Sequence, residues 1–427
     1  MWEQIRKNKR NSVILVLCMA LVLFVLGYFL GEYLHPGYGI YGLAAAFGLL
    51  MVQSTVSFFA GDKIVLGISK ARKITRDIHP TLYNVVEEMK IASSLPKVPD
   101  VYIIDDPALN AFATGRNPEK SAVAVTSGLL EVLTRDELQG VMAHEIAHIK
   151  NRDVLFITMV GIMMGTIVVL ADLGLRHMFW GGGGRRRTSR NEGGQIQALI
   201  MIIAIIFIIL SPVIAQLIYF AISRKREYLA DAGAVQFTRY PLGLAGALEK
   251  IGESTAQLKS ATKATAPMYI ANPFKGKGKS LANLSSTHPP LDERIKILRN
   301  MTGAGLSSYD EAYKKTTGRP VGAIPASAIK TDKSSPLGTV LPETGLVAAA
   351  AGTSEQTPDT DLKKQNVSVQ TQDHVSRTRE TTDALWKLNK YKFIECDCDT
   401  NLKIPQVYAN KIIECPHCLK SHRVALA

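Results

Sequence analysis

The chain has 427 residues, of which 47% are hydrophobic and 20% charged, a composition too apolar for an intrinsically disordered protein. Its net charge of +13 would suit a nucleic-acid-binding protein, but the positive mean hydropathy of +0.08 indicates long apolar segments and favours a membrane protein. Five cysteines are too few for a disulfide scaffold.

Two apolar segments near the N-terminus are long enough to span a membrane. Residues 12–30 carry no charge, and a second apolar run, residues 38–60, follows shortly after. At 1.5 Å per residue, the first segment approaches the roughly 30 Å of a bilayer core. A cleaved signal peptide is the alternative, but this run is too long for one and no small-residue cleavage site follows. We therefore expect residues 1–61 to form an uncleaved transmembrane hairpin.

Basic residues predict the orientation of this hairpin. No Lys or Arg lies in the turn between the spans, whereas basic residues flank both outer ends: Arg6, Lys7, Lys9, Arg10, Lys63, Lys70, Arg72, Lys73 and Arg76. Since cytoplasmic flanks are enriched in Lys and Arg, both ends should be cytoplasmic.

Two further apolar segments, residues 154–175 and 198–222, are also long enough to span. The loop between them is rich in glycine and arginine, which opposes the positive-inside bias if the pair forms a second full hairpin. Either this loop is an exception or the pair does not span fully. The glycine pairs Gly27/Gly31 and Gly161/Gly165 have the spacing of close helix contacts, but we attribute them to the general abundance of glycine in membrane helices.

A soluble domain is expected around these segments, over residues 62–300. After the first hairpin, periodicity predicts a helix and three strands, at residues 81–92, 99–104, 111–115 and 121–126. A capping-box sequence, Thr134-Arg-Asp-Glu137, then predicts the start of another helix.

This last helix carries His144-Glu-Ile-Ala-His148. Residues four apart share one face of a helix, so both imidazoles can reach one zinc ion, with Glu145 beside them to hold a water molecule. Two histidines on an amphipathic helix are the ordinary alternative, because the motif also arises by chance. A catalytic zinc usually has three protein ligands, so a third is expected elsewhere.

The third ligand is not the one that metzincins use, because Asn151 and Val154 stand where that pattern has Gly and His. Two carboxylates one helical turn apart, Glu227 and Asp231, follow the fourth apolar run. Glu227 could bind the metal while Asp231 accepts the N–H of a ligating histidine. Alone, the pair would also fit the solvated face of a charged helix.

Four motifs in this order resemble the HtpX group of membrane-bound zinc metalloproteases, which are related to the prenyl-protein-processing membrane endopeptidases and a mitochondrial inner-membrane quality-control protease. The motifs are Asn110-Ala-Phe112, His144-Glu-Ile-Ala-His148, Arg226-Glu-Tyr-Leu-Ala-Asp231 and Thr287-His-Pro-Pro-Leu-Asp-Glu-Arg294. The resemblance covers residues 1 to about 300.

This resemblance implies zinc ligation by His144, His148 and Glu227. It implies that Asn110, with Ala111 and Phe112, lies on an edge strand facing the substrate, and that His288 and Arg294 help to hold the scissile region. Zinc would activate a water molecule from which Glu145 takes the proton, while His288 and Arg294 stabilise the developing oxyanion.

The implied substrates are peptides and proteins, mainly misfolded or damaged membrane proteins. Their cleavage is expected at the cytoplasmic face of a bacterial-type inner membrane, with the catalytic domain and the C-terminus in the cytoplasm, in protein quality control and the stress response. The alternative is a membrane-tethered binding or adaptor protein, whose C-terminal module contacts a partner or nucleic acid.

The remainder of the chain is not explained by the resemblance. Residues 301–380 contain few large apolar groups and are expected to be a flexible linker. Residues 381–427 carry two cysteine pairs that resemble a zinc ribbon: Cys396, Cys398, Cys415 and Cys418. The first pair is spaced by one residue instead of two, which departs from the usual knuckle. We expect a structural zinc here and a protein partner in preference to nucleic acid.

The expected fold is therefore a mainly α integral membrane protein. Its catalytic domain should be zincin-like and α+β, with a small sheet, an edge strand and an active-site helix bearing the histidine pair. A small zinc-ribbon-like module should follow at the C-terminus.

Overall fold

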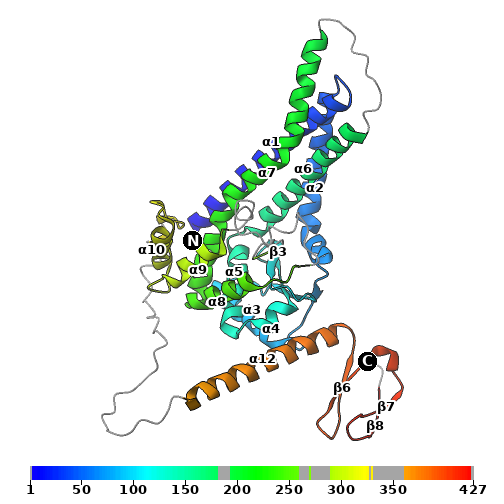
Figure 1. Ribbon diagram of the computed structural model, residues 1–427, viewed down its shortest axis with the longest axis vertical. Coiled ribbons are helices and arrows are strands. Elements are labelled where there is room, and N and C mark those ends of the chain that lie inside the picture. The colour runs from blue at the N-terminus through cyan, green and yellow to red at the C-terminus, as the bar shows by residue number, and fades with distance from the viewer. Residues whose placement is uncertain are drawn as a thin grey trace.

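The computed structural model describes residues 2–180, 193–258, 269–270, 289–326, 328–329 and 360–424. Four long helices form an elongated bundle, and a compact α/β region lies at one end of it (Figure 1). A further long helix crosses below this region and leads to a small β module near the C-terminus.

The bundle consists of α1 (Trp2–Leu34), α2 (Gly39–Ile68), α6 (Val154–Trp180) and α7 (Gly193–Thr238). By length and composition each helix contains a stretch able to cross a membrane: Ser12–Leu34, Gly39–Ile68, Val154–His177 and Met201–Ile218. These stretches overlap the four apolar segments predicted from the sequence. The pair α6 and α7 runs beside α1 and α2 in the same bundle (Figure 1), sharing an apolar core with them.

Small and polar side chains fit the bundle helices together. A Cβ atom added at Gly42 would lie 2.2 Å from the carbonyl oxygen of Gly27 and 3.0 Å from Cα of Gly31. Our attribution of Gly27 and Gly31 to background abundance was therefore wrong, because they form the close contact between α1 and α2. Between α2 and α6, Thr166 Oγ1 donates a hydrogen bond to Gln53 Oε1 at 2.8 Å.

The α/β region is built on a four-stranded sheet of order β1-β2-β4-β3. Its strands are β1 (Arg72–Lys73), β2 (Asp100–Ile104), β3 (Ala111–Asn117) and β4 (Lys120–Thr126). The strands β2 and β4 are parallel, and β3 pairs antiparallel with β4 at the edge of the sheet. The strand β3 is therefore an edge strand that contains Ala111 and Phe112, whereas Asn110 immediately precedes it.

Helices pack around this sheet: α3 (Pro80–Ser93), α4 (Ser127–Val132), α5 (Arg135–Lys150), α8 (Pro241–Glu253) and α9 (Leu291–Arg299). The predicted capping box opens α5, since Thr134 accepts from the backbone N–H of Glu137 and the Glu137 carboxylate accepts from the backbone N–H of Thr134. All but one of the residues of α5 from Leu138 to Ile149 are buried, so this helix lies at the centre of the domain.

The expected linker over residues 301–380 differs from the structure. Helix α10 (Leu306–Thr317) buries Leu306, Tyr309 and Tyr313 in the main core, and α12 (Thr360–Leu388) covers much of the end of that range. The composition of the whole range is poor in large apolar residues, but three of them at helical spacing suffice to dock α10 on the core already formed by its neighbours. Residues 330–359 lie outside the described residues.

The C-terminal module consists of two β-hairpins. The first pairs β5 (Lys392–Glu395) with β6 (Asn401–Ile404), and the second, after the short 3₁₀ helix η2 (Gln406–Tyr408), pairs β7 (Ile412–Glu414) with β8 (Ser421–Arg423). Each hairpin turn carries one cysteine pair. The first cysteine pair, with its unusual spacing, lies in a shorter turn than the second pair. In the first turn the Asp399 N–H donates to the Cys396 carbonyl, three residues earlier. In the second turn the Leu419 N–H donates to the Cys415 carbonyl, four residues earlier.

Helix α12 is attached to the α/β region at the N-terminus of α3. The Glu380 carboxylate accepts hydrogen bonds from the backbone N–H of Thr81 at 2.9 Å and from its hydroxyl at 2.8 Å, and lies 3.2 Å from His79 Nδ1. Burial alone would raise the pKa of Glu380, but His79 and Thr81 outweigh it and lower the pKa to about 2. Ala384, one turn along, is buried in the main core.

We expect Glu380→Ala to lower the free energy of unfolding of the full chain by about 1.5–3 kcal/mol at pH 7, the usual range for hydrogen bonds to a charged group. Because the folded pKa of Glu380 lies below its ordinary value of 4.5, this contribution is present above pH 4.5 and is lost as the pH falls toward 2. Denaturant unfolding at several pH values measures it, with the exposed Glu395→Ala as control. An equal loss across that pH range would contradict the assignment.

Candidate functional site

The site lies where α5 crosses α7. A Cβ atom added at Gly233 would be 2.8 Å from Cβ of Ala147, so glycine allows α7 to approach α5 closely at this point. One and a half turns earlier on α7, Glu227 then reaches the face of α5 that carries His144 and His148. Since residues four apart share one helix face, Asp231 lies on the same side of α7 as Glu227 and contacts His144.

The three predicted ligands come together. His144 Nε2 and His148 Nε2 are 3.2 Å apart, and the Glu227 carboxylate lies 3.6 Å from the first and 3.5 Å from the second. Two ligand atoms bound tetrahedrally to zinc at about 2.0–2.1 Å lie about 3.3–3.4 Å apart. His144, His148 and Glu227 therefore form a possible metal site whose spacing fits zinc.

The buried charges around this cluster also fit a divalent cation. Metal ligation requires neutral imidazoles, and in that state four buried carboxylates would face two buried guanidiniums: Glu145, Asp153, Glu227, Asp231, Arg226 and Arg294. With the carboxylates ionised, two negative charges of this group would then be uncompensated by protein cations. Burying unpaired charge is costly, and a bound divalent cation would balance both.

Behind His144, a carboxylate and a guanidinium form a continuous series of polar contacts. His144 Nδ1 lies 3.0 Å from Asp231 Oδ1, and Arg294 donates to both oxygens of Asp231, at 2.9 and 2.6 Å. Burial alone would lower the pKa of His144, but Asp231 and Glu227 outweigh it and raise the pKa to about 9. Burial would likewise raise the pKa of Asp231, but Arg294 and His144 lower it. Asp231 therefore remains ionised beside Nδ1, and when the imidazole is neutral it favours the tautomer whose Nε2 is free to bind a metal.

The position of Arg294 differs from the expected contact with substrate. Its side chain is fully buried, its guanidinium is bonded to Asp231, and Nη1 donates to the Ile270 carbonyl at 3.2 Å. Arg294 Nη1 also lies 3.7 Å from Oε2 of Glu227, so the guanidinium lies behind the candidate metal ligands and supports them through Asp231 and Glu227. His288, the other residue expected to contact the scissile region, lies outside the described residues.

Glu145 connects the metal cluster to the edge strand. The backbone of Ala113 on β3 lies near its carboxylate and favours the ionised form, and Glu145 is almost fully buried. Burial raises the pKa of Glu145 above its ordinary value, while His144 and His148 counteract part of this increase. A carboxylate with a raised pKa beside a metal site is suited to accept and return a proton.

The predicted substrate-contact residues are buried, and the edge is partly paired with the chain itself. Asn110, Ala111 and Phe112 are all buried, and Ile270 N–H donates to the Ala111 carbonyl at 3.0 Å. Tyr269 forms a bridge to Phe112, with their rings edge to face. A substrate strand can therefore pair with β3 at Ala111 only if Ile270 leaves it.

A further carboxylate, Asp153, was not singled out from the sequence. Its Oδ2 lies 3.3 Å from Nδ1 of His148, the same atom that Asp231 contacts on His144. The one signal available was its position five residues after His148, just beyond the end of α5.

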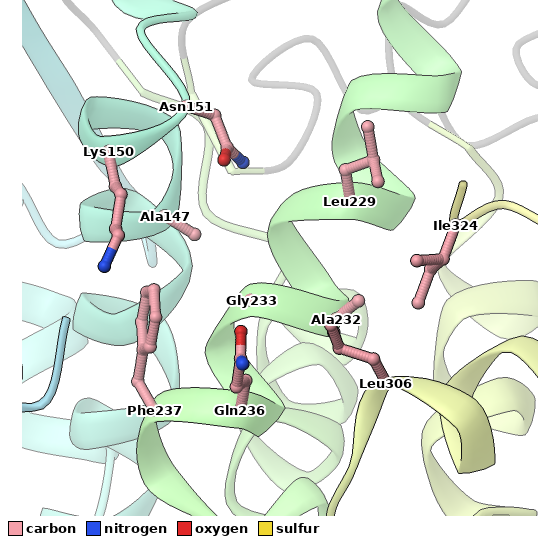
Figure 2. A pocket seen from close by; sticks show the side chains of 10 residues that line it. All are labelled: Ala147, Lys150, Asn151, Leu229, Ala232, Gly233, Gln236, Phe237, Leu306 and Ile324. Carbon is pink, nitrogen blue, oxygen red and sulfur yellow. The ribbon is translucent and has the colours of Figure 1, made fainter. Parts of the chain in front are cut away.

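A small cavity between α5 and α7 is not the substrate site. Figure 2 shows it between α5 and α7, where its lining residues come from both helices and from Leu306 and Ile324. Its volume is about 30 Å³, which is the space of one water molecule, and none of its lining residues is a metal ligand.

Comparisons with known proteins identify the group to which this arrangement belongs. The description of peptidase family M48 matches residues 76–302. The chain is 42% identical over 300 residues to a protease HtpX homolog of Dictyoglomus thermophilum, covering 70% of this chain and 94% of that protein. It is 41% identical over 301 residues to the homolog of Streptococcus uberis, covering 70% of this chain and 100% of the relative.

Among solved structures, the crystal structure of S. mikatae Ste24p is similar, with a TM-score of 0.35 and 17% identity, covering 70% of this chain and 67% of that one. The family match spans α3 to α9 and so includes every residue of the metal cluster described above. The chain therefore belongs to peptidase family M48 and is a metalloprotease with four candidate membrane helices.

Proposed function

We propose that this metalloprotease is a membrane-anchored zinc endopeptidase in which Glu145 is the general base. The observation that carries the proposal is that one buried carboxylate, Glu145, lies beside the cluster of His144, His148 and Glu227 and near the backbone of the edge strand β3. A base next to both the metal ligands and a strand edge can reach an extended peptide that pairs with that edge.

His144, His148 and Glu227 would hold the zinc ion. When bound, zinc lowers the pKa of a water molecule and polarises the peptide carbonyl. Glu145 accepts the proton of the attacking water and passes it to the leaving amine, while Asp231 and Arg294 keep His144 in place. We retain His288 as the group proposed to stabilise the developing oxyanion.

Extended substrates are proposed to bind along β3 from Ala113 onward. Main-chain hydrogen bonds to a strand edge select little by side chain, so broad specificity follows. The proposed contacts of Asn110, Ala111 and Phe112 with substrate require Tyr269 and Ile270 to leave the strand. Substrates of this kind are unfolded segments, as in misfolded or damaged membrane proteins, which suits a role in quality control.

Cleavage of an unfolded protein by the purified chain tests this function. Casein should be cleaved in detergent with zinc, cleavage should stop with a chelator and return when zinc is restored. Cleavage unaffected by complete removal of the metal would refute the proposal. The binding-protein alternative predicts no cleavage under any of these conditions, but every group that the chemistry needs on α5 and α7 is present.

We propose further that the α/β region and the C-terminus lie in the cytoplasm, with the bundle in a bacterial-type inner membrane. Helix α6 starts shortly after His148, and the spanning part of α7 ends before Glu227. Because both residues belong to one cluster, the two helices leave and return on the same side. Basic residues flanking the first hairpin favour the cytoplasm as that side.

A cysteine placed at Pro118, at the tip of the sheet, should resist a membrane-impermeant maleimide in intact spheroplasts and react after the membrane is opened. A cysteine at the exposed His35, in the turn between α1 and α2, should react without opening. Labelling of position 118 in intact spheroplasts would contradict the proposed cytoplasmic location of the α/β region.

We propose a second, structural zinc in the C-terminal module. Cys396, Cys398, Cys415 and Cys418 have Sγ atoms within 4.8 Å of one another, and the Cys398–Cys415 separation is 3.7 Å. Four thiolates about 2.3 Å from one zinc would lie about 3.8 Å apart. His422 Nε2 lies 3.1 Å from Cys396 Sγ, within reach for a hydrogen bond that holds the thiolate.

The full chain should then bind two zinc ions. Changing Cys415 and Cys418 to Ser should remove one ion, unfold the module and leave casein cleavage intact, because small metal modules gain their folding free energy from the metal. Metal analysis with a thiol assay measures this, and Cys18→Ser should keep both ions. One zinc in the unmodified chain with four reactive module thiols would contradict the second site.

A further inference from the structure

The carboxylate beside His148 is held by the chain path between α5 and α6. Helix α5 ends at Lys150, and Arg152 adopts a left-handed φ of 59°. This turn brings Asp153 back toward the helix end, where its N–H donates to the His148 carbonyl at 3.0 Å. Its own carbonyl accepts from Ile157 in the first turn of α6. The backbone of Asp153 is therefore fixed at both sides of its side chain.

The side chain of Asp153 lies between a histidine and an arginine. Oδ2 is 3.3 Å from His148 Nδ1, and Oδ1 is 3.8 Å from Nε of Arg226. Both Asp153 and Arg226 are buried, so their opposite charges are shielded from water. The position of Arg226, directly before the ligand Glu227 on α7, places this pair next to the metal cluster.

Arg226 extends the contact to the first membrane helix. Its Nη2 donates to Ser12 Oγ at 2.5 Å, and Ser12 is fully buried at the start of the first candidate span. A series of contacts thus runs from α1 through Ser12, Arg226 and Asp153 to His148. It parallels the series from Arg294 through Asp231 to His144, so each histidine has a buried carboxylate on Nδ1 and a buried arginine behind it.

We propose that Asp153 is a positioning residue that orients His148, and that Ser12 on the first membrane helix fixes Asp153 through Arg226. The inference rests on the proposed zinc site. A carboxylate on Nδ1 selects the tautomer whose Nε2 is free to bind metal and restricts rotation of the ring. The membrane hairpin thereby contributes to the order of the metal site as well as to anchoring.

Zinc affinity of the full chain tests the proposal without relying on activity. Competition with a chelator should show that Asp153→Ala weakens zinc binding at the histidine site by about 10–100-fold, the usual effect of removing such a partner. Asp153→Asn keeps an oxygen that can accept from Nδ1 and should bind zinc more tightly than the alanine variant. Ser12→Ala should weaken binding by a smaller factor, below about tenfold, because it removes one hydrogen bond from a residue that Arg226 and Asp153 separate from His148.

Matched controls separate this effect from general damage to the fold. Asp310 is similarly buried and has Ile324 N–H and Lys314 as partners, not a histidine of the cluster, so Asp310→Ala should leave zinc affinity unchanged. Ser57 is a buried serine of the second membrane helix, and Ser57→Ala should likewise have no effect. Any zinc in the cysteine module is common to all variants and cancels from the comparison.

Each possible result of the zinc-affinity measurements tests a different part of the proposal. Unchanged affinity in both Asp153 variants, with zinc bound by the parent chain, would overturn the positioning role alone. Weakened binding in Asp153→Ala with none in Ser12→Ala would remove the contribution of the membrane helix. A parent chain that binds no zinc at the histidine site would overturn the proposed function and this inference with it.

Discussion

Glu145→Gln should reduce casein cleavage by about 10²–10⁴-fold while the chain keeps its zinc. The substitution retains the size of the side chain and removes its ability to accept a proton, and a positioned general base contributes a factor of this order. The ligands His144, His148 and Glu227 are untouched. Cleavage rates and zinc content measured on the same preparation test the prediction.

Glu137→Gln on the same helix is the matched control. Gln at this position still supports the capping box with Thr134, so fold and cleavage should both persist. If Glu145→Gln cleaved as fast as the parent, Glu145 would not be the base. If it lost zinc as well as activity, the loss of cleavage would reflect a damaged metal site, contrary to the assignment of a proton-transfer role.

Arg294→Ala should destabilise the folded chain by about 3–5 kcal/mol, the cost of leaving a buried charge without its partner. The guanidinium makes two hydrogen bonds to Asp231, and both side chains are fully buried. Without Arg294 the ionised Asp231 loses its partner beside His144, so zinc affinity should fall together with stability. Denaturant unfolding monitored by circular dichroism measures the first effect and chelator competition the second.

Arg299, on the same helix, provides a close comparison. It makes a two-bond pair with Glu249 of the same kind, at 2.6 and 2.7 Å, but at the exposed surface. Arg299→Ala should therefore cost about 0–1 kcal/mol and leave zinc affinity unchanged. Equal effects of the two substitutions would show that burial of the Arg294–Asp231 pair has no energetic importance.

The parts of the site that follow local helical spacing were predictable from the sequence. His144 and His148 are one turn apart on a helix with a recognisable capping box, and Glu227 and Asp231 repeat that spacing on α7. The apolar segments were predictable because a spanning helix must satisfy its backbone internally and face lipid with apolar side chains. The resemblance to a known family linked the two helices, which spacing alone could not do.

The contacts that depend on the path of the chain between elements were not predictable. Asp153 reaches His148 only because the left-handed residue Arg152 turns the backbone after α5. Arg294 was expected to face substrate, but its position behind Asp231 depends on how α9 packs on α8 and α10, which brings its side chain to α7. The pairing of Ile270 with Ala111 joins residues far apart in sequence and has no local pattern.

The regions around the core were misjudged for a related reason. An average over residues 301–380 concealed Leu306, Tyr309 and Tyr313, which dock α10 on the core. The attachment of α12 depends on hydrogen bonds that the Glu380 carboxylate accepts from Thr81 at the N-terminus of α3. The sequence around Glu380 does not indicate that α3 lies next to it in the fold. Composition describes what a segment could bury alone, whereas these helices use a surface that other segments provide.

X-ray diffraction on both sides of the zinc absorption edge, from crystals of the purified full chain, would locate any zinc bound by the histidine cluster. We expect an anomalous peak within about 2.0–2.2 Å of Nε2 of His144, Nε2 of His148 and a carboxylate oxygen of Glu227. A peak at the four cysteines with none among these three residues, in crystals grown with zinc, would contradict this expectation.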